Sequence, residues 1–232
     1  MNAIEHIFEP TRLFLVWHRP LSSGAKSRRV VGELVRHGND ALFRYLKGTK
    51  DFDDALLEGF YEFPAFADTS NSSFTTGALD VFLKRLPPRK REDFREYLAQ
   101  YNLPPDFQGS DFALLGYTGA KLPSDTFELC PDLSDAEVPL DFVIEAVGLS
   151  HHLPESIDVS IGDQVELEED LDNPHDENAI RIVYKGQKIG FINRALALSF
   201  KRLLERGTLD ASIVKFSASG PKKRLLILVR FN

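Results

Sequence analysis

Hydrophobic and polar residues form two kinds of pattern in the first half of the chain, one typical of strands and one typical of helices. Apolar residues dominate two short runs, Arg12–Trp17 and Arg29–Val35, which predict two strands joined by a polar loop over Ser22–Arg28. Apolar positions at helical spacing predict helices further along, most clearly in Thr76–Leu86, which a Pro-Pro pair ends. The other elements expected here are helices over Asp40–Leu46 (capped by Asn39), Asp51–Phe60, Arg89–Tyr101 and Ser110–Tyr117, and a strand over Thr126–Leu129.

The second half is mostly β in character. One amphipathic helix is expected, Arg194–Glu205, with Gly207 as its C-cap, and Lys185-Gly186 is typical of a hairpin turn. The expected strands are Phe142–Leu149, Gln164–Glu169, Ala179–Tyr184, Lys188–Asn193, Leu209–Ser217 and Arg224–Phe231. Short strands of this number with one main helix favour a small, OB-like β-barrel. The fold class expected for the whole chain is therefore α+β, a mixed α/β domain followed by this barrel.

A segment rich in acidic residues and bracketed by prolines marks the expected domain boundary. Residues 131–139 (PDLSDAEVP) contain few large apolar side chains and are interpreted as a linker. This places one domain at residues 12–130 and a second at residues 140–232. Residues 1–11 are expected to form a flexible tail.

Composition and charge narrow the classes of function. The 232 residues carry a formal net charge of −7, which argues against a protein that coats nucleic acid nonspecifically. Cys130 is the single cysteine, so no disulfide and no cysteine zinc cluster can form within the chain. No apolar run is long enough to cross a bilayer and no signal peptide precedes the first strand, so a cytoplasmic protein without membrane contact is expected.

The charges are unevenly distributed in the second half. Residues 132–177 contain 15 acidic residues and no Lys or Arg, whereas residues 178–232 contain 12 basic residues and two acidic ones. Two interpretations stay open. Neighbouring strands could neutralise each other, or a basic face could attract phosphate beside an acidic face.

The most distinctive segment is DNPHDENAI, residues 172–180. Asn173 precedes Pro174 and is therefore biased toward an extended conformation, while Asp176 and Asn178 can hydrogen-bond their own backbone and hold a turn. The segment predicts a rigid polar corner that leads into a strand. From the local residues alone, a well-made loop without a ligand is at least as good an interpretation.

This segment, the following KIGFI (residues 188–192) and the apolar positions of the next helix together resemble the HIRAN domain family. The similarity extends to Val147-Gly148-Leu149 and covers nearly the whole second half of the chain. The resemblance implies a barrel related to the OB-fold that binds single-stranded DNA or DNA 3′ ends and is not an enzyme. The DNA-binding residues it implies are Ser150, His151, Asp172, Asn173, His175, Asp176, Lys188 and Phe191.

Within this implied site, Asp176 would bond the terminal hydroxyl and His175 would stack on a base. Two departures from the family pattern stand out. Ser150 replaces an arginine, and histidines occupy two aromatic positions, His151 and His175. His151, His152, Asp172, His175 and Asp176 could alternatively be a metal cluster, but adjacent histidines on a strand point to opposite faces. Neither a metal nor another cofactor is expected.

The first half resembles, through short apolar motifs only, the N-terminal subdomain of HipA-type toxin kinases. These motifs include Val31-Gly32-Glu33-Leu34 and Phe112-Ala113-Leu114-Leu115-Gly116. The resemblance implies a domain that docks a protein, such as a HipA-like kinase or a DNA-repair protein. Catalytic motifs of a kinase are absent from the sequence. Tyr61, Phe63 and Phe66 are candidates for an apolar docking patch.

Two functions remain from the sequence. The first is a non-catalytic DNA-binding adaptor whose second half binds DNA while its first half docks a partner. The alternative is an antitoxin-like regulator of a HipA-type kinase that acts through protein contacts with little DNA binding.

Overall fold

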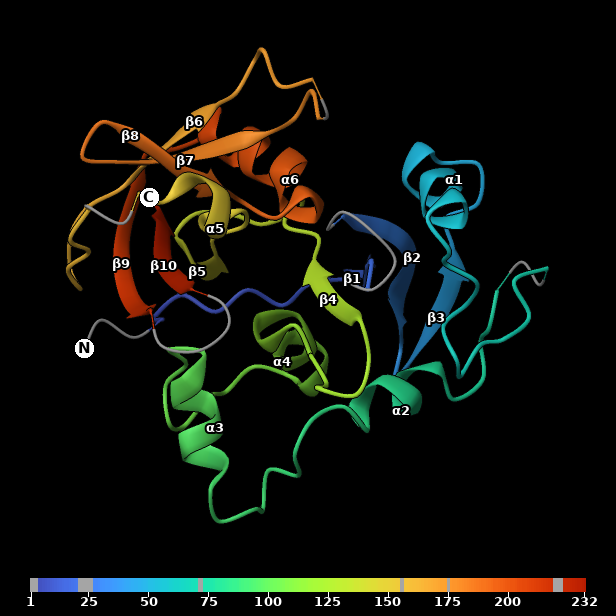
Figure 1. The fold of residues 1–232 in the computed structure, drawn as a ribbon. Coiled ribbons are helices and arrows are strands. Elements are labelled where there is room, and N and C mark those ends of the chain that lie inside the picture. Colours follow the sequence, from blue (N-terminus) through green and yellow to red (C-terminus); the bar gives the residue numbers. More distant parts are fainter. Residues whose placement is uncertain (1–3, 21–26, 71–72, 155–156, 175, 219–222) are drawn as a thin grey trace. The chain divides into compact units, whose positions relative to one another are not determined.

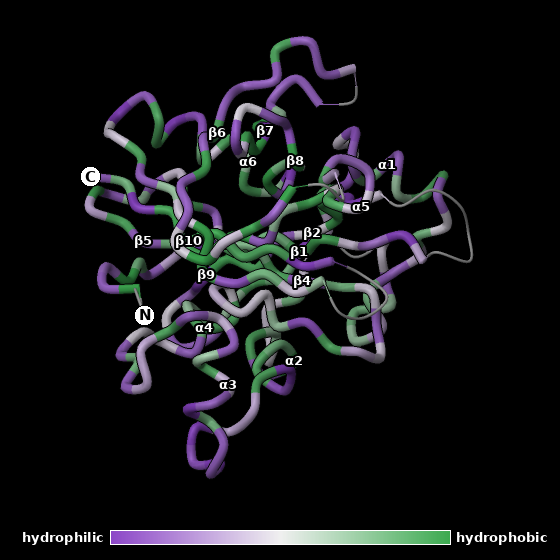
Figure 2. Tube along the Cα trace, turned by 60° about the vertical axis from the view of Figure 1, so that its left-hand side comes forward, coloured by the Kyte–Doolittle hydropathy of each residue, from purple (hydrophilic) through white to green (hydrophobic). Residues whose placement is uncertain are grey.

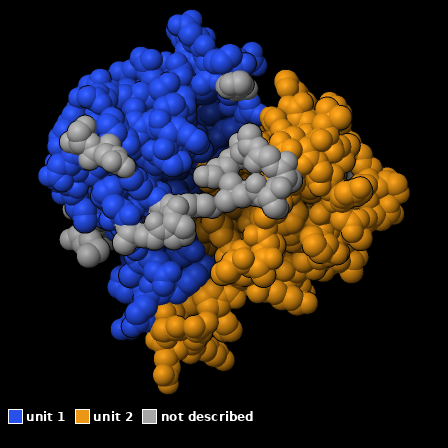
Figure 3. Space-filling model, viewed as in Figure 1, with its two compact units in different colours: residues 1–8, 95–107, 133–232 blue, residues 9–94, 108–132 orange. Residues whose placement is uncertain are grey.

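The computed structural model describes residues 4–20, 27–70, 73–154, 157–174, 176–218 and 223–232. The chain forms two compact units, each made of separate segments (Figure 3). Unit 2 comprises residues 9–94 and 108–132. Unit 1 comprises residues 4–8, 95–107 and 133–232 within the described ranges.

Unit 2 is built on a four-stranded antiparallel sheet with the strand order β3-β2-β1-β4 (Figure 1). Its strands are β1 (Arg12–His18), β2 (Arg28–His37), β3 (Asp40–Tyr45) and β4 (Phe127–Pro131). Its helices are α1 (Lys50–Leu57), α2 (Ala78–Leu83) and α4 (Asp111–Thr118). Ser110 is the N-cap of α4, since its hydroxyl accepts a hydrogen bond from the Ala113 N–H. Residues 22–26 of the expected loop lie outside the described residues.

Aromatic side chains fill the core of unit 2 against one face of this sheet. Hydrophobic positions follow β1, β2 and β4 in Figure 2. Phe43 stacks on Phe66 with ring centroids 4.7 Å apart, and Phe63 stacks on Phe82 at 5.1 Å. The Tyr45 hydroxyl donates to the Phe66 carbonyl and accepts from the Phe63 N–H, each at 2.7 Å. The expected apolar patch is therefore wrong for Phe63 and Phe66, because both are buried.

The expected helix over Asp40–Leu46 is also wrong, because this segment forms strand β3. Ala41, Phe43 and Tyr45 alternate into the core, which is the period of a strand. The expected cap Asn39 therefore begins no helix, whereas the neighbouring Asp40 caps a distant one. Its carboxylate accepts from the Gly77 and Leu79 N–H groups at the start of α2.

The described part of unit 1 contains six strands in two three-stranded antiparallel sheets, ordered β5-β10-β9 and β6-β7-β8. The first sheet consists of β5 (Leu140–Glu145), β9 (Leu209–Ser217) and β10 (Arg224–Phe231). The second consists of β6 (Glu166–Glu169), β7 (Ile180–Tyr184) and β8 (Gln187–Phe191). The helices are α5 (Leu149–His152), α6 (Arg194–Leu204) and most of α3 (Phe94–Gln100). The expected turn at Lys185-Gly186 is confirmed, since both residues have positive φ.

Two isolated bridges join the two sheets. Val147, just after β5, bridges Phe191 of β8, and Gln164, just before β6, bridges Ser212 of β9. The strands therefore follow one another in a ring with the order β9-β10-β5-β8-β7-β6. Two neighbouring pairs in this ring, β5 with β8 and β6 with β9, are joined by a single bridge and not by a full ladder of hydrogen bonds. Among the described residues the sheets do not close into a continuous barrel, so the expected barrel is present only as two sheets joined at these bridges.

Segments remote in the sequence complete unit 1. Ile4 is buried, and the Glu5 N–H donates to the carboxylate of Asp141, which is 1% exposed, at 2.7 Å. This part of the expected tail is thus fixed to β5. Residues 95–107 also belong to this unit, although the sequence places them in the first domain. In the expected linker, Leu133 is buried and its N–H donates to the Ser199 hydroxyl.

The expected C-cap role of Gly207 is wrong, because α6 ends at Leu204 with Glu205 as its C-cap in the right-handed region, and Gly207 has no positive φ. Gly207 instead permits a close backbone approach. A Cβ atom there would lie 2.6 Å from the Asn232 carbonyl oxygen.

Candidate nucleic-acid interface

Lys188 and Phe191 of β8 lie on the same face of their sheet because of a β-bulge. In a regular strand, residues three apart point to opposite faces. The register between β7 and β8 shifts at Ile182/Val183, so that Lys188 pairs with Val183 while Phe191 pairs with Arg181. The Lys188 ammonium consequently lies 5.0 Å from the centroid of the Phe191 ring. The bulge creates a cation–aromatic pair on the face of the sheet opposite to the buried side chains of Ile182 and Ile189.

Gly190 allows the neighbouring segment to approach this pair. Val147 and Phe191 exchange two backbone hydrogen bonds of 2.7 and 2.9 Å. A Cβ atom at position 190 would lie 2.6 Å from the Val147 carbonyl oxygen, so only glycine fits without a shift. This contact places the start of α5 directly beside β8.

Helix α5 brings His152 onto Phe191. The helix follows Gly148, whose φ of +81° favours glycine, and it makes one turn over Leu149–His152. The rings of His152 and Phe191 meet edge to face, with centroids 5.4 Å apart. Ser150 and His151 lie on the same turn and are exposed.

The ionisation of His152 reflects its surroundings. Burial lowers the pKa of His152, and the charges of Lys188 and His151 lower it further, whereas Asp170 acts in the opposite direction. The imidazole is therefore neutral at physiological pH. A neutral ring can stack on a base without adding a positive charge.

The polar corner is held by its own side chains. The Asn173 N–H donates to the Asp170 carbonyl, and the Asn173 amide donates to the Asp170 carboxylate at 3.2 Å. The Asn173 side-chain oxygen accepts from the Asp176 N–H, and Asp176 accepts from the Asn178 N–H at 3.0 Å. The turn-holding role expected for the Asp176 side chain is of this kind, whereas Asn178 contributes its backbone N–H. Pro174 lies between these hydrogen-bonded residues.

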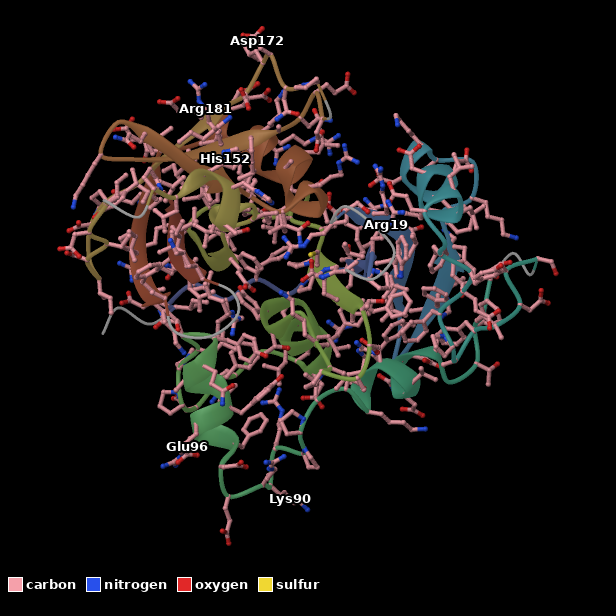
Figure 4. The ribbon with its side chains drawn as sticks, viewed as in Figure 1. Arg19, Lys90, Glu96, His152, Asp172 and Arg181 are labelled. Atoms are coloured by element: carbon pink, nitrogen blue, oxygen red, sulfur yellow. The ribbon has the colours of Figure 1, made fainter. Side chains whose placement is uncertain are left out.

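An ion pair joins the corner to α6. Arg194 Nε donates to Asp176 Oδ2 at 2.9 Å, so each oxygen of this carboxylate has at least one donor. Asp172, by contrast, is exposed at the outer end of the loop, farther from the sheet than Arg181 and His152 (Figure 4).

The implied site residues thus separate into two groups. The first group consists of Ser150 and His151 on α5 and of Lys188 and Phe191 on β8, two elements that contact each other. The second group consists of Asp172, Asn173 and Asp176 on the corner. Asp170, at the start of the corner, lies close enough to affect the pKa of His152. His175 lies outside the described residues. Within the described ranges, no three His, Cys, Asp or Glu side chains lie close enough to hold a metal ion.

Ion pairs between the acidic and basic segments neutralise much of the charge segregation. Arg181 pairs with Glu168 at 2.7 Å, Lys201 with Glu169 at 2.9 Å, and Arg224 with Glu145 at 3.0 Å. Lys188 differs from these residues, since among the described residues no carboxylate pairs with its ammonium group. The interpretation of mutually neutralising strands therefore holds for these pairs, and Lys188 is an exposed cation outside them.

The roles of His152 and Arg194 do not follow from the sequence patterns. The sequence suggests His152 only as a metal ligand on a strand, but it lies on a helical turn and contacts Phe191. The glycine at position 148 is the sequence feature that could have indicated this turn. Arg194 was assigned only to a helix, and its link to Asp176 across 18 positions leaves no local pattern.

Comparison with known proteins identifies the second half of the chain. Residues 140–231 match the family model of the HIRAN domain. The solved structure of the HIRAN domain of human HLTF is 20% identical, with a TM-score of 0.33, and the match covers 39% of this chain and 74% of that one. A protein from Lactobacillus plantarum is also 20% identical, with a TM-score of 0.32 and coverage of 41% and 96%.

A search of curated proteins found no match. None of these findings supports the resemblance of residues 12–130 to the HipA subdomain. Within the described ranges, no helix is long and apolar enough to cross a membrane.

Proposed function

We propose, from the HIRAN domain at residues 140–231, that this chain binds single-stranded DNA and catalyses no reaction itself. The observation that carries the proposal is the Lys188 ammonium, 5.0 Å from the ring centroid of Phe191 on an open face of the sheet. Lys188 is exposed, and among the described residues it has no carboxylate partner.

This pair combines the two contacts that single-strand binding needs. An aromatic face accepts any base, at about 1–3 kcal/mol per stacked base, and a cation follows the phosphate backbone. Phe191 is half-buried, so its ring is already held in place by the Val147 bridge and by His152. A preorganised ring loses little conformational freedom when a base stacks on it.

The surrounding charges favour modest affinity. Arg181 and Arg194 are held by carboxylates, and Asp172 and Glu177 are exposed beside the corner. We therefore expect micromolar or weaker binding that decreases as salt rises, since each phosphate contact releases counterions.

We further propose that the corner recognises the 3′ end of the strand. In this proposal Asp176 accepts a hydrogen bond from the terminal hydroxyl, while Asp172 and Asn173 shape the rim. A carboxylate has about four acceptor positions, so the donors from Arg194 and Asn178 leave capacity for a ligand hydroxyl. His151, and His175 beyond the described residues, would supply further stacking contacts.

The first half would act as the protein-docking part of an adaptor. Leu57 and Tyr61 are 88% and 83% exposed on unit 2, which is unusual for large apolar side chains and supports a contact with another protein. No described feature favours the alternative of a kinase regulator.

Titration of labelled single strands by fluorescence anisotropy tests the proposal. A strand with a 3′ hydroxyl should bind more tightly than the same strand with a 3′ phosphate, because a phosphate cannot donate to a carboxylate and is repelled by it. Equal binding of the two strands would reject end recognition and leave only backbone and base contacts. Absence of binding to either strand at low salt would reject the function itself.

A further inference from the structure

Two cationic side chains and one histidine surround a buried carboxylate at the edge of the sheet of unit 2. Glu128 of β4 is 3% exposed. His18 Nε2 lies 2.9 Å from Glu128 Oε1, Lys121 Nζ lies 2.7 Å from Oε2, and Arg28 Nε lies 3.8 Å from Oε1. None of these residues belongs to the HIRAN domain, and none takes part in the interface described above.

The register of the sheet explains why these groups meet. His18 pairs with Arg28 across β1 and β2, so their side chains share a face. Val16, two residues before His18, pairs with Glu128 of β4 and brings its carboxylate to that same face. Lys121 reaches it from the turn between α4 and β4, where the Leu129 N–H donates to the Gly119 carbonyl. Backbone pairing thus positions the whole cluster.

The charges do not balance within the cluster. Glu128 stays ionised: the charge of Lys121, the hydrogen bond and charge of His18, and the charge of Arg28 lower its pKa well below the ordinary value despite burial. One negative charge faces two permanent positive charges, those of Arg28 and Lys121. The carboxylate fixes the positions of the cations without cancelling them.

Arg28 provides the available donors. Its guanidinium carries five N–H groups. Among the described residues it makes no hydrogen bond, and its one ion-pair contact is the 3.8 Å approach to Glu128. The side chain is 25% exposed, so these donors can reach a ligand. The neighbouring Arg29 differs, since it pairs with Asp54 and Glu58 of the α1 region and is fully engaged.

We propose that His18, Arg28 and Lys121 form a second phosphate-binding site, on the sheet of unit 2, for a phosphate of a bound nucleic-acid strand. Planar guanidinium groups bind phosphate through two parallel N–H donors, and Lys121 adds a point charge. The inference rests on the proposed single-strand binding and extends it to the half of the chain outside the HIRAN domain. It assigns the cluster to the strand's backbone, so the site carries no sequence preference.

The salt dependence of single-strand binding by the full chain tests this site. Arg28→Gln should lower the slope of log affinity against log salt by about 0.7, the value for one phosphate contact on a single strand. The affinity at fixed salt should fall roughly two- to fivefold. Arg28→Lys should keep the slope, because the charge remains. The matched control is Lys90→Gln, which removes an exposed charge on the same unit and should leave the slope unchanged.

Arg28 is the preferred position because Glu128 keeps Lys121 and His18 as closer partners when Arg28 is replaced. An unchanged melting temperature of Arg28→Gln confirms that the effect comes from binding. Equal slopes for Arg28→Gln and Lys90→Gln, with normal binding by the wild type, overturn this inference alone. A wild type that binds no single strand overturns the proposed function and this inference together.

A competition experiment distinguishes two possible ligands of the cluster, a phosphate of the strand's backbone and free inorganic phosphate. Inorganic phosphate is compared with chloride at equal ionic strength. We expect the difference between wild type and Arg28→Gln to persist in both salts. Its disappearance in low millimolar phosphate would show that the cluster holds free phosphate, and would overturn the assignment to DNA.

Discussion

Arg194 Nε lies 2.9 Å from Asp176 Oδ2, and this ion pair fixes the polar corner to the first residue of α6. Asp176 also accepts the Asn178 N–H, so one side chain holds both the turn and its attachment to the helix. The conformation of the corner therefore depends on the residue for which the family resemblance implies a role in binding. Variants at Asp176 will report on stability as well as on DNA.

Replacing Asp176 with alanine should lower the free energy of unfolding by about 1–3 kcal/mol, because Arg194 and the Asn178 N–H lose a charged acceptor. Chemical denaturation followed by circular dichroism measures the change. Asp172→Ala is the matched control, since Asp172 is exposed at the loop tip, and its effect should stay within roughly 0.5 kcal/mol. Similar losses for the two variants would contradict the structural role of Asp176.

Tyr45→Phe should destabilise the protein by roughly 1–3 kcal/mol, because the Phe63 N–H and the Phe66 carbonyl lose their buried partner. Tyr61→Phe is the control, since the Tyr61 side chain is 83% exposed. Thermal unfolding should separate the two variants clearly. If Tyr45→Phe has the same melting temperature as the wild type, the Tyr45 hydroxyl does not stabilise the Phe63–Phe66 turn.

The buried Glu128 should make stability sensitive to acid. Its surrounding cations hold its pKa in the folded protein well below the ordinary value of 4.5, so the unfolded chain takes up the proton first. The stabilisation is complete above pH 4.5 and is lost as pH falls through the folded pKa.

Denaturation at a series of pH values tests this dependence. Glu128→Gln should be less stable at neutral pH by roughly 1–3 kcal/mol and should lose less stability below pH 4.5 than the wild type does. Parallel profiles for the two proteins would show that Glu128 does not titrate as described.

The titration of His152 tests the proximity of α5 and β8. Burial and the charges of Lys188 and His151 place its pKa below 6.5. Lys188→Gln removes one of these charges and should move the NMR titration midpoint of His152 upward, whereas Lys185→Gln should leave it in place. If Lys188→Gln does not change the titration midpoint of His152, the result would contradict the proximity of His152 to β8.

The sequence predicted most elements of unit 1 because alternation and turn residues act locally. Lys185-Gly186 marks the hairpin between β7 and β8, and the amphipathic pattern marks α6. In unit 2 the same local reasoning failed over Asp40–Leu46, where a capping residue, Asn39, preceded apolar positions. The neighbouring Asp40 caps α2, 37 residues later, and strand pairing with β2 decides the conformation of its own segment.

The candidate site was predictable only in part. The corner residues and Phe191 follow from the family resemblance. The shared face of Lys188 and Phe191 depends on a bulge that strand periodicity does not reveal. The approach of His152 depends on Gly148 and Gly190, and the Glu128 cluster depends on strands distant in the sequence. Such contacts arise from tertiary pairing, which local patterns do not encode.

The most direct test of the account compares single-strand affinity of the wild type, Lys188→Gln and Lys185→Gln under identical salt. Lys185 is exposed on the same hairpin but already donates to the Asp158 carbonyl at 2.9 Å, so it is the matched control. The account predicts measurable binding by the wild type, a loss of affinity and a salt slope lower by about 0.7 for Lys188→Gln, and no change for Lys185→Gln. Equal affinity of all three proteins, or no binding by the wild type at low salt, would contradict it.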